Sequence, residues 1–158
     1  MVRLVRMNEK EFEQFIQIAV DDYARQQVAA GAWQQQNAVE LSRHAFNSLL
    51  PKGLASPDQF LNLLIREEDN EQVGYVWFGI LEEEDNRFVV LFDIIIFEQY
   101  RRLGYGREAM IAMEKIVKEL GIKSIALHVF GNNMGARALY KELGYLERNI
   151  TMVKELKE

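Results

Sequence analysis

An apolar stretch that leads directly into a glycine-containing turn and then a helix constrains the fold of this chain most strongly. The stretch from Phe88 to Phe97 is apolar and rich in β-branched residues apart from Asp93, as is typical of a buried strand. The segment from Tyr100 to Gly106 then carries two glycines, and apolar residues at helical spacing continue to Leu120. A strand, turn and helix in this order indicate an α/β fold whose helix packs on the sheet.

The rest of the chain has the patterns of a mixed α/β domain. Asn8 and Asn37 are each followed by Glu three residues later, which predicts the N-caps of two helices. The second of these helices is expected to bury a stripe made of Ala38, Leu41, Ala45 and Leu49. The predicted strands cover residues 2–7, 60–66, 73–81, 87–97, 123–130 and 145–153, and a last helix covers 132–143. With 158 residues, we expect one domain spanning 1–158.

Charge and composition exclude several classes of function. A formal net charge of −5 argues against a general nucleic-acid-binding protein, because binding phosphates requires local positive charge. The absence of cysteine excludes a disulfide scaffold, a cysteine-based zinc site and an acyl-cysteine intermediate. No apolar stretch is long enough for a signal peptide or a membrane span. We therefore expect a cytoplasmic protein with no metal, no nucleic-acid partner and no membrane partner.

The turn after the long strand is a candidate anion site. Arginines lie at positions 101, 102 and 107, and glycines lie at positions 104 and 106. Unpaired N–H groups at the start of a helix attract anions, and glycine lets the backbone approach a phosphate closely. This combination suits a pyrophosphate, and the alternative is an ordinary turn with solvated arginines.

The same turn also matches the dinucleotide pattern G-x-G-x-x-A from Gly104 to Ala109. That pattern normally opens the first strand–helix–strand unit and is followed about 20 residues later by an acidic residue. The corresponding region, residues 128–132, contains no acid, and the turn lies in the middle of the chain. A nicotinamide cofactor is therefore disfavoured.

A second motif follows about 30 residues downstream, from Asn133 to Tyr145. Helical spacing places Asn133, Ala136 and Tyr140 along one side of the helix. A small residue between an amide and a phenol would let a slender ligand lie close to the helix. Taken alone, Tyr140 is better explained as a core or boundary tyrosine than as a ligand contact.

Together the two motifs resemble the GCN5-related N-acetyltransferase (GNAT) superfamily. Its first motif, [R/Q]-x-x-G-x-[G/A], is matched by Arg101, Gly104 and Gly106. Its second, N-x-x-A-x-x-L-Y-x-x-x-G-[F/Y], is matched by Asn133, Ala136, Leu139, Tyr140, Gly144 and Tyr145. The resemblance implies the acyl-CoA N-acyltransferase fold, a mostly antiparallel mixed sheet flanked by helices. It also implies acetyl-CoA as the acetyl donor.

The resemblance also implies roles for individual residues. Backbone groups of the central strand would pair with the pantetheine arm, amides and arginines of the turn would hold the pyrophosphate, and Tyr140 would protonate the departing thiolate. The expected acetyl-CoA-binding residues are Ile94, Ile95, Ile96, Arg101, Arg102, Leu103, Gly104, Tyr105, Gly106, Arg107, Asn132, Asn133, Ala136 and Tyr140.

The base that deprotonates the acceptor is left open by the sequence. Asp93 is the nearest acid, and a carboxylate in an apolar strand is either hydrogen-bonded to a neighbour or raised in pKa. A water relay through the acidic run from Glu82 to Asp85 is a further alternative. We expect acetyl transfer to a primary amine of a small molecule or peptide. A homodimer is a further expectation, because members of the family that the chain resembles often dimerise. A CoA-binding sensor without catalysis is the alternative function.

Overall fold

The computed structural model describes residues 1–157, which form a mixed α/β structure. Two compact units are distinguished, Met1–His128 and Val129–Glu158, and each is described separately. The first unit contains a five-stranded sheet in the order β1-β2-β3-β4-β5. Its strands are β1 (Val2–Arg6), β2 (Gln59–Arg66), β3 (Gln72–Glu83), β4 (Asn86–Ile96) and β5 (Ile125–Leu127). The first four strands pair antiparallel and β5 runs parallel to β4, so the predicted mixed α/β fold class is confirmed.

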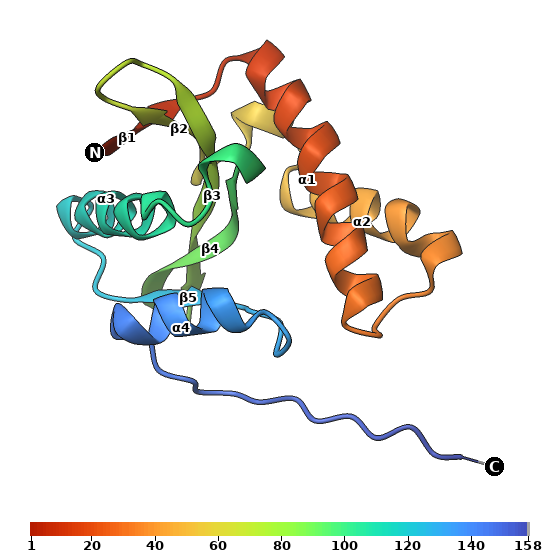
Figure 1. Cartoon of the computed structure of the whole chain (residues 1–158). Coiled ribbons are helices and arrows are strands. Elements are labelled where there is room, and N and C mark those ends of the chain that lie inside the picture. Colours follow the sequence, from red (N-terminus) through yellow and green to blue (C-terminus); the bar gives the residue numbers. More distant parts are fainter. Residues whose placement is uncertain (158) are drawn as a thin grey trace. The chain divides into compact units, whose positions relative to one another are not determined.

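Three helices flank this sheet in layers. Helices α1 (Glu9–Ala29) and α2 (Gln35–Leu49) lie on one face, and α3 (Tyr105–Glu119) lies on the other (Figure 1). Short 3-10 turns η1 (Gly53–Ala55) and η2 (Glu98–Tyr100) follow α2 and β4. No helix in the described part of the chain is long and apolar enough to cross a membrane.

The core between the sheet and the α1–α2 layer follows the sheet register. Leu63, Tyr75 and Ile95 are paired across β2, β3 and β4, so their side chains share one face of the sheet. They pack with Phe15 of α1 and Phe46 of α2 in one hydrophobic cluster. This row fixes which residues of β4 face the helices, and therefore where the functional side chains of β4 point.

The first helix begins as the sequence predicts. The Asn8 side chain accepts a hydrogen bond from the Glu11 backbone N–H at 2.8 Å, and the Glu11 carboxylate accepts one from the Asn8 N–H at 2.9 Å. These two reciprocal bonds satisfy N–H groups that the helix itself leaves unpaired.

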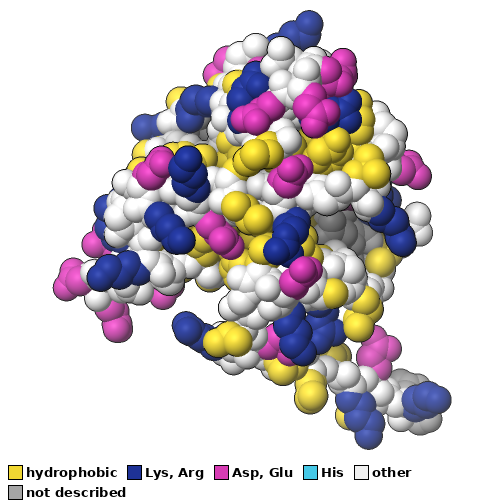
Figure 2. Space-filling view, turned by 60° about the vertical axis from the view of Figure 1, so that its left-hand side comes forward, with side chains coloured by type: hydrophobic (Ala, Val, Ile, Leu, Met, Phe, Trp, Pro, Cys, Tyr) yellow, Lys and Arg dark blue, Asp and Glu magenta, His cyan; other side chains and the backbone are white. Residues whose placement is uncertain are grey.

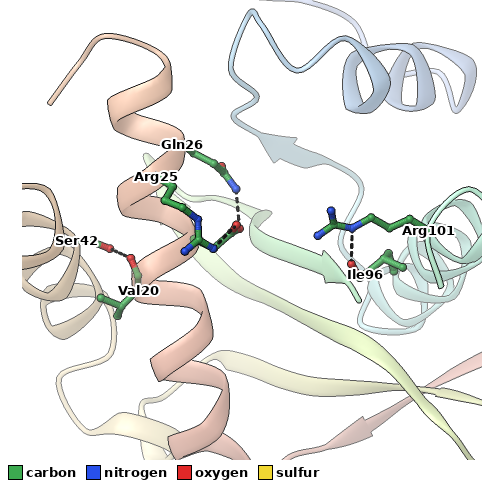
Figure 3. A network of polar contacts seen from close by, with 7 residues as sticks. Val20, Arg25, Gln26, Ser42, Ile96 and Arg101 are labelled. Atoms are coloured by element: carbon green, nitrogen blue, oxygen red, sulfur yellow. Dashed lines mark hydrogen bonds and ion pairs between the residues drawn. The ribbon is translucent and has the colours of Figure 1, made fainter. Parts of the chain in front are cut away.

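The second helix differs from its prediction. It starts after Gln34 rather than at Asn37, and its buried face consists of Ala38, Ser42 and Phe46, while Leu41 and Leu49 are exposed. The Ser42 hydroxyl donates to the Val20 carbonyl of α1 at 2.7 Å, as Figure 3 shows. A buried hydroxyl with a partner costs little, so the polar residue can occupy the interface. Of the predicted apolar stripe, Ala38 is confirmed as buried, and the prediction is wrong for Leu41 and Leu49.

The second unit contains α4 (Met134–Glu142) and the segment that follows it. Asn133 caps the helix and Gly144, at φ +95°, ends it. The predicted strand over 145–153 is not formed, because the described residues after α4 have no ladder partner and run on as extended chain (Figure 1). Strand β5 is also shorter than the predicted 123–130.

Candidate functional site

The C-terminal half of β4 has an open edge. Strand β5 pairs with β4 only at Val89, Val90 and Leu91, so within the described chain no strand covers that edge over residues 92–96. The Phe97 N–H donates to the Val73 carbonyl of β3 at 2.9 Å. Because backbone groups alternate sides along a strand, Ile94 and Ile96 turn theirs toward the open edge. An extended ligand with amide groups could add there like a further strand.

Arg101 lies at the end of this open edge. Its Nε donates to the Ile96 carbonyl at 2.9 Å, as Figure 3 shows. The contact fixes the guanidinium beside the strand end, where its charge is available to an anion. Ile95, by contrast, is buried in the core and pairs with Tyr75, so its backbone belongs to the β3 side of the strand.

The turn before α3 concentrates unpaired backbone donors. Arg102 and Gly104 have φ values of +62° and +87°, so two residues of this turn adopt the left-handed backbone conformation. In the described part of the chain, the backbone N–H groups of residues 102 to 106 donate to no acceptor. The start of α3 adds its positive dipole end, and Arg107 lies in its first turn. The arrangement is that of an anion-binding cradle.

Tyr105 anchors the turn to the sheet. Its hydroxyl accepts a hydrogen bond from the Arg66 guanidinium at 3.0 Å, and this guanidinium also lies 5.2 Å from the Tyr100 ring centroid. Asp69 binds Arg66 through both carboxylate oxygens, at 2.9 and 2.6 Å. Asp69 and then Tyr105 hold the pKa of Arg66 above its usual range, so Arg66 stays charged. The Tyr105 side chain thus positions the turn. The side chain of Leu103, another predicted donor-binding residue, is exposed to solvent.

A bulge in β4 places Asp93 on the α1 side of the sheet. Trp77 pairs with Asp93 and Phe78 pairs with Leu91, so Phe92 is an extra residue in the ladder. Phe92 packs against the core cluster, and its ring stacks on Trp77 at 4.7 Å between centroids. Ile95 lies in the same cluster, and Asp93, two residues before it, points to the same face of the sheet. The consecutive side chains of Phe92 and Asp93 therefore both face α1.

Asp93 is a perturbed carboxyl group. Some of its surface remains accessible, but protein surrounds most of the side chain. Burial and, after it, the negative charge of Asp22 raise its pKa to about 7, while the Ile94 N–H partly opposes the rise. No ion pair joins it to an arginine among the described residues. Of the two readings that the sequence left open, the structure favours the raised pKa.

Asp22 is a residue that sequence reasoning missed. It lies on α1, three residues after the buried Ala19, and so sits at the edge of the buried face. Gln26 donates to Asp22 at 2.8 Å and Arg25 lies 3.5 Å from it. Figure 3 shows Arg25 and Gln26 extending from α1 toward the side where Arg101 lies. A carboxylate at the margin of an apolar helix face was the signal that could have identified it.

An aromatic row leads from the α1–α2 connection to the bulge. The Tyr23 ring lies 5.6 Å from Trp33 and 6.0 Å from Phe46, and Phe46 lies 5.4 Å from Trp77. Trp77 then stacks on Phe92, the residue before Asp93. These rings pack on one another and form the apolar wall beside the carboxyl group.

The acidic run from Glu82 to Asp85 is far from this site. Glu82 and Glu83 end β3, and Glu84 and Asp85 form the turn to β4, at the end of β4 opposite to Ile96. At about 3.3 Å per residue, the strand from Asn86 to Asp93 spans roughly 20 Å. A water relay through this run would therefore have to cross much of the strand, and it stays a prediction beside Asp93 as the base.

The second unit carries the remaining motif residues on α4. The Asn133 side-chain oxygen accepts from the Ala136 N–H at 3.2 Å, so this oxygen caps the helix, and Asn132 precedes it. Tyr140 is 9% exposed, and its ring lies 5.8 Å from that of Tyr145. Asn133, Ala136 and Tyr140 thus belong to one short helix.

Comparison with known proteins identifies the family of this chain. The model of the acetyltransferase (GNAT) family matches residues 12–145. The uncharacterized N-acetyltransferase YycN of Bacillus subtilis (strain 168) is 33% identical over 98% of this chain and 99% of its own. The uncharacterized N-acetyltransferase YdgE of the same organism is 30% identical over 95% of each chain.

Solved structures agree on the fold. The crystal structure of YycN superposes with a TM-score of 0.94 and covers 100% of both chains. An aminoglycoside acetyltransferase from an uncultured soil metagenomic sample shares the fold at a TM-score of 0.62 and 16% identity, over 99% of this chain and 97% of its own. The two motifs, the fold and the family match lead to one conclusion: the chain belongs to the GNAT family of acetyltransferases.

Proposed function

We propose that the protein transfers the acetyl group of acetyl-CoA to a primary amine by direct attack in a ternary complex. One observation carries the proposal: the open edge of β4 ends beside a turn whose backbone N–H groups are unpaired. An edge that accepts an amide-containing chain, next to a cradle for a pyrophosphate, fits the two halves of CoA. The absence of cysteine supports direct attack over an acyl-cysteine intermediate.

The donor would bind along β4 and the start of α3. Ile94 and Ile96 would exchange backbone hydrogen bonds with the pantetheine arm, since their polar groups face the open edge. The N–H groups of residues 102–106 would hold the pyrophosphate, with the charges of Arg101 and Arg102 adding to the attraction. Asn133 and Ala136 of α4 would line the pantetheine arm.

The chemistry requires two proton transfers. The amine nitrogen forms a bond to the thioester carbon while the carbon–sulfur bond breaks. The Tyr140 hydroxyl gives its proton to the departing CoA thiolate, which lowers the cost of expelling negative charge. Asp93 takes the proton that the amine loses, and a pKa of about 7 suits a base working near neutral pH.

The acceptor side lies toward α1. Asp22 is near enough for its negative charge to raise the pKa of Asp93, and two carboxyl groups on this side favour an acceptor that arrives as an ammonium ion and gives its extra proton to solvent before it attacks. The aromatic row ending at Phe92 offers an apolar wall for the carbon chain of the acceptor. We therefore propose a cationic primary amine of a small molecule or a peptide as the acceptor class.

We also propose that residues 1–158 act as one acetyltransferase domain. The family match runs from residue 12 to residue 145 and so includes motif residues from both units. In a donor complex, limited proteolysis is expected to leave the chain uncut near residue 129. Cleavage there that persists with acetyl-CoA bound would contradict a single domain.

The first experiment compares the thermal stability of the protein alone with that in acetyl-CoA, CoA or NAD, together with CoA-thiol release in a panel of amines. A ligand at a hundredfold excess over its Kd adds about 2.7 kcal/mol of stability, so both CoA species are expected to raise the Tm and NAD to leave it unchanged. Thiol release that depends on an amine would confirm the transfer. Binding without release for any amine would favour the CoA-binding sensor, and no binding would overturn both functions.

A further inference from the structure

Arg66 connects the hairpin between β2 and β3 to the turn before α3. It is the last residue of β2, and the residue before it, Ile65, belongs to the core cluster on the α1–α2 face of the sheet. Because successive side chains of a strand point to opposite faces, Arg66 points to the face on which α3 lies. Its Nη1 donates to the Tyr105 hydroxyl at 3.0 Å, so one side chain joins two elements that are distant in the sequence.

The guanidinium of Arg66 contacts both ends of the turn. Tyr100 is the last residue of η2 and Tyr105 is the first residue of α3, so the two tyrosines flank residues 101–104. The guanidinium carbon lies 5.2 Å from the ring centroid of Tyr100 and 5.8 Å from that of Tyr105. A cation at these distances is attracted to the faces of aromatic rings. The contacts therefore hold the two ends of the turn at a fixed separation.

Asp69 holds Arg66 in this place. Its two carboxylate oxygens accept from Nε and Nη2 of Arg66, and one of them also accepts from the Glu71 N–H at 3.2 Å. The hydrogen bond from Arg66 keeps the pKa of Asp69 below its usual range, so the pair stays charged at neutral pH. An ion pair in open solvent stabilises little, but the Arg66 side chain is only 20% exposed and its planar fork is bound by both carboxylate oxygens. The pair therefore orients the guanidinium toward the tyrosines.

The turn that these contacts hold has a strained backbone. Arg102 has a φ of +62°, a conformation that residues with a Cβ rarely adopt. Such a conformation persists only where surrounding contacts impose it. Among the described residues, the N–H groups of residues 102–106 donate to no acceptor, so their own hydrogen bonds do not impose it. The Arg66 contacts at the two ends of the turn are contacts that can.

The surface charge gives an anion little general attraction. The formal net charge is −5, and Figure 2 shows Lys and Arg side chains intermingled with Asp and Glu on the face that it draws. Binding at the turn therefore depends on N–H groups that already point in fixed directions, because ordering them during binding would cost free energy.

We propose that Arg66, oriented by Asp69, is a positioning residue that holds residues 101–104 in their anion-binding conformation before the donor arrives. The guanidinium touches the tyrosines and not the donor, so it acts on donor affinity and not on the chemical step. The inference rests on the proposed function for the identity of the anion, acetyl-CoA. The holding of the turn is a property of the free protein.

Trypsin tests the holding of the turn without any donor. Arg101 and Arg102 are exposed, and trypsin cleaves after either of them when the turn opens. Cleavage there, assigned by mass spectrometry, is expected to be about tenfold faster in Arg66→Gln than in the wild-type protein. The matched control Arg3→Gln loses the same charge and a 2.9 Å hydrogen bond to Asn70 of the same hairpin, and is expected to be cut at the wild-type rate. Equal rates in the two variants would overturn the inference.

Donor titration tests whether the held turn sets the affinity. Arg66→Gln is expected to raise the Kd for acetyl-CoA about tenfold in calorimetry, and to leave kcat within about twofold at saturating donor. Arg66→Lys keeps the charge but not the planar fork, so it is also expected to bind the donor more weakly. Wild-type affinity in Arg66→Lys, or a loss in kcat equal to the loss in affinity, would contradict a positioning role.

A double-mutant cycle separates positioning from direct contact with the donor. Tyr105→Phe removes the hydroxyl that Arg66 binds and keeps the ring. If Arg66 acts through this contact, Arg66→Gln/Tyr105→Phe binds acetyl-CoA no more weakly than Arg66→Gln alone. Losses that add would mean that Arg66 contacts the donor itself, and the inference would fail.

The outcomes for the wild-type protein distinguish this inference from the proposed function. If the wild-type protein binds no acetyl-CoA, the proposed function fails and the trypsin rates still decide whether Arg66 holds the turn. If the wild-type protein binds acetyl-CoA and Arg66→Gln binds it equally well, the inference alone fails.

Discussion

Helices α3 and α4 are built alike, but the chain behaves differently after each. Both are amphipathic, both carry a lysine in the last turn, and both end at a glycine with positive φ, Gly121 at +76° and Gly144 at +95°. After Gly121 the chain enters β5, whereas after Gly144 it stays extended without a ladder. The comparison shows that a helix and its end are set locally, while a strand also requires an edge to pair with.

The two helices also differ in the chemistry proposed for them. The start of α3 offers backbone donors to an anion, and α4 carries the phenol of Tyr140. Substitutions near α3 are therefore expected to change donor binding, and substitutions on α4 to change the chemical step. The predictions below test that division.

The largest expected effect is that of Tyr140→Phe. Loss of a general acid typically lowers kcat by 10²- to 10⁴-fold, while the donor contacts of β4 and the turn remain. Steady-state kinetics and acetyl-CoA titration would measure the two quantities separately. Tyr145→Phe, which removes the neighbouring hydroxyl, serves as the control and is expected to keep kcat within a few-fold. An equal loss of donor affinity in Tyr140→Phe would remove the distinction between the helices.

Gly74→Ala tests how closely β3 and β4 must pack at the end of β4 that leads to the turn before α3. A Cβ at Gly74 would lie 1.9 Å from the Ile95 carbonyl oxygen, so β3 and β4 would have to separate where the open edge begins. We expect a loss of about 3 kcal/mol in the free energy of unfolding, measured by denaturant titration. Gly79→Ala is the matched control, because the atoms nearest to its Cβ belong to the Gln59 side chain and not to the backbone. Equal losses in the two variants would show that β4 is not specially constrained there.

Gly104→Val and Gly144→Val change a glycine at the start of α3 and a glycine after the end of α4. Both positions have positive φ, which costs a β-branched residue roughly 1–2 kcal/mol. Gly104 belongs to the turn with unpaired N–H groups, so its substitution is expected to weaken acetyl-CoA binding about tenfold in a calorimetric titration. Gly144→Val is expected to destabilise the protein with unchanged affinity. Unchanged affinity in Gly104→Val would remove the turn from the donor site.

The pH dependence of Asp93 is the smallest of these effects. As a base, Asp93 acts when ionised, so kcat/KM is expected to rise with pH through about 7. Asp22→Asn removes a negative charge that raises this pKa, so the rise is expected to move to lower pH. Asp93→Asn is expected to abolish the rise, and its persistence would exclude Asp93 as the base.

The same group links stability to pH. A carboxyl whose folded pKa lies above its ordinary value of 3.8 stabilises the fold while protonated, so this contribution is complete below about pH 4 and is lost as pH rises through 7. In Asp93→Asn, melting curves at several pH values are expected to lack this loss.

Much of the fold could be predicted from the sequence because its signals are local. The capping box at Asn8, the glycine after each motif helix and the long strand before the turn all depend on neighbouring residues. Ser42 could not be predicted as buried, because its partner carbonyl lies 22 residues away on another helix. The segment over 145–153 was also predicted as a strand from its pattern, but the described residues there form none, since a strand depends on a partner outside the segment.

In the candidate site too, residues within one local motif could be predicted, and residues that depend on tertiary packing could not. The turn from Arg101 to Gly106 and the helix of Tyr140 were found from motif spacing, since each lies within one element. Asp22 was missed because only the packing of α1 on the sheet brings it to Asp93. The orientation of Asp93 could not be predicted either, since it depends on the extra residue Phe92 in the ladder.

Because Phe92 is an extra residue in the ladder, the number of residues in β4 determines which face of the sheet each later side chain occupies. Removing one residue between Val90 and Asp93 would close the bulge and turn either Asp93 or the isoleucines after it to the opposite face. Side chains in this stretch can be exchanged one at a time, but a single insertion or deletion would separate the carboxyl group from the open edge. Natural variation in length is therefore expected at the exposed β3–β4 turn, and none is expected in the seven residues from Val90 to Ile96.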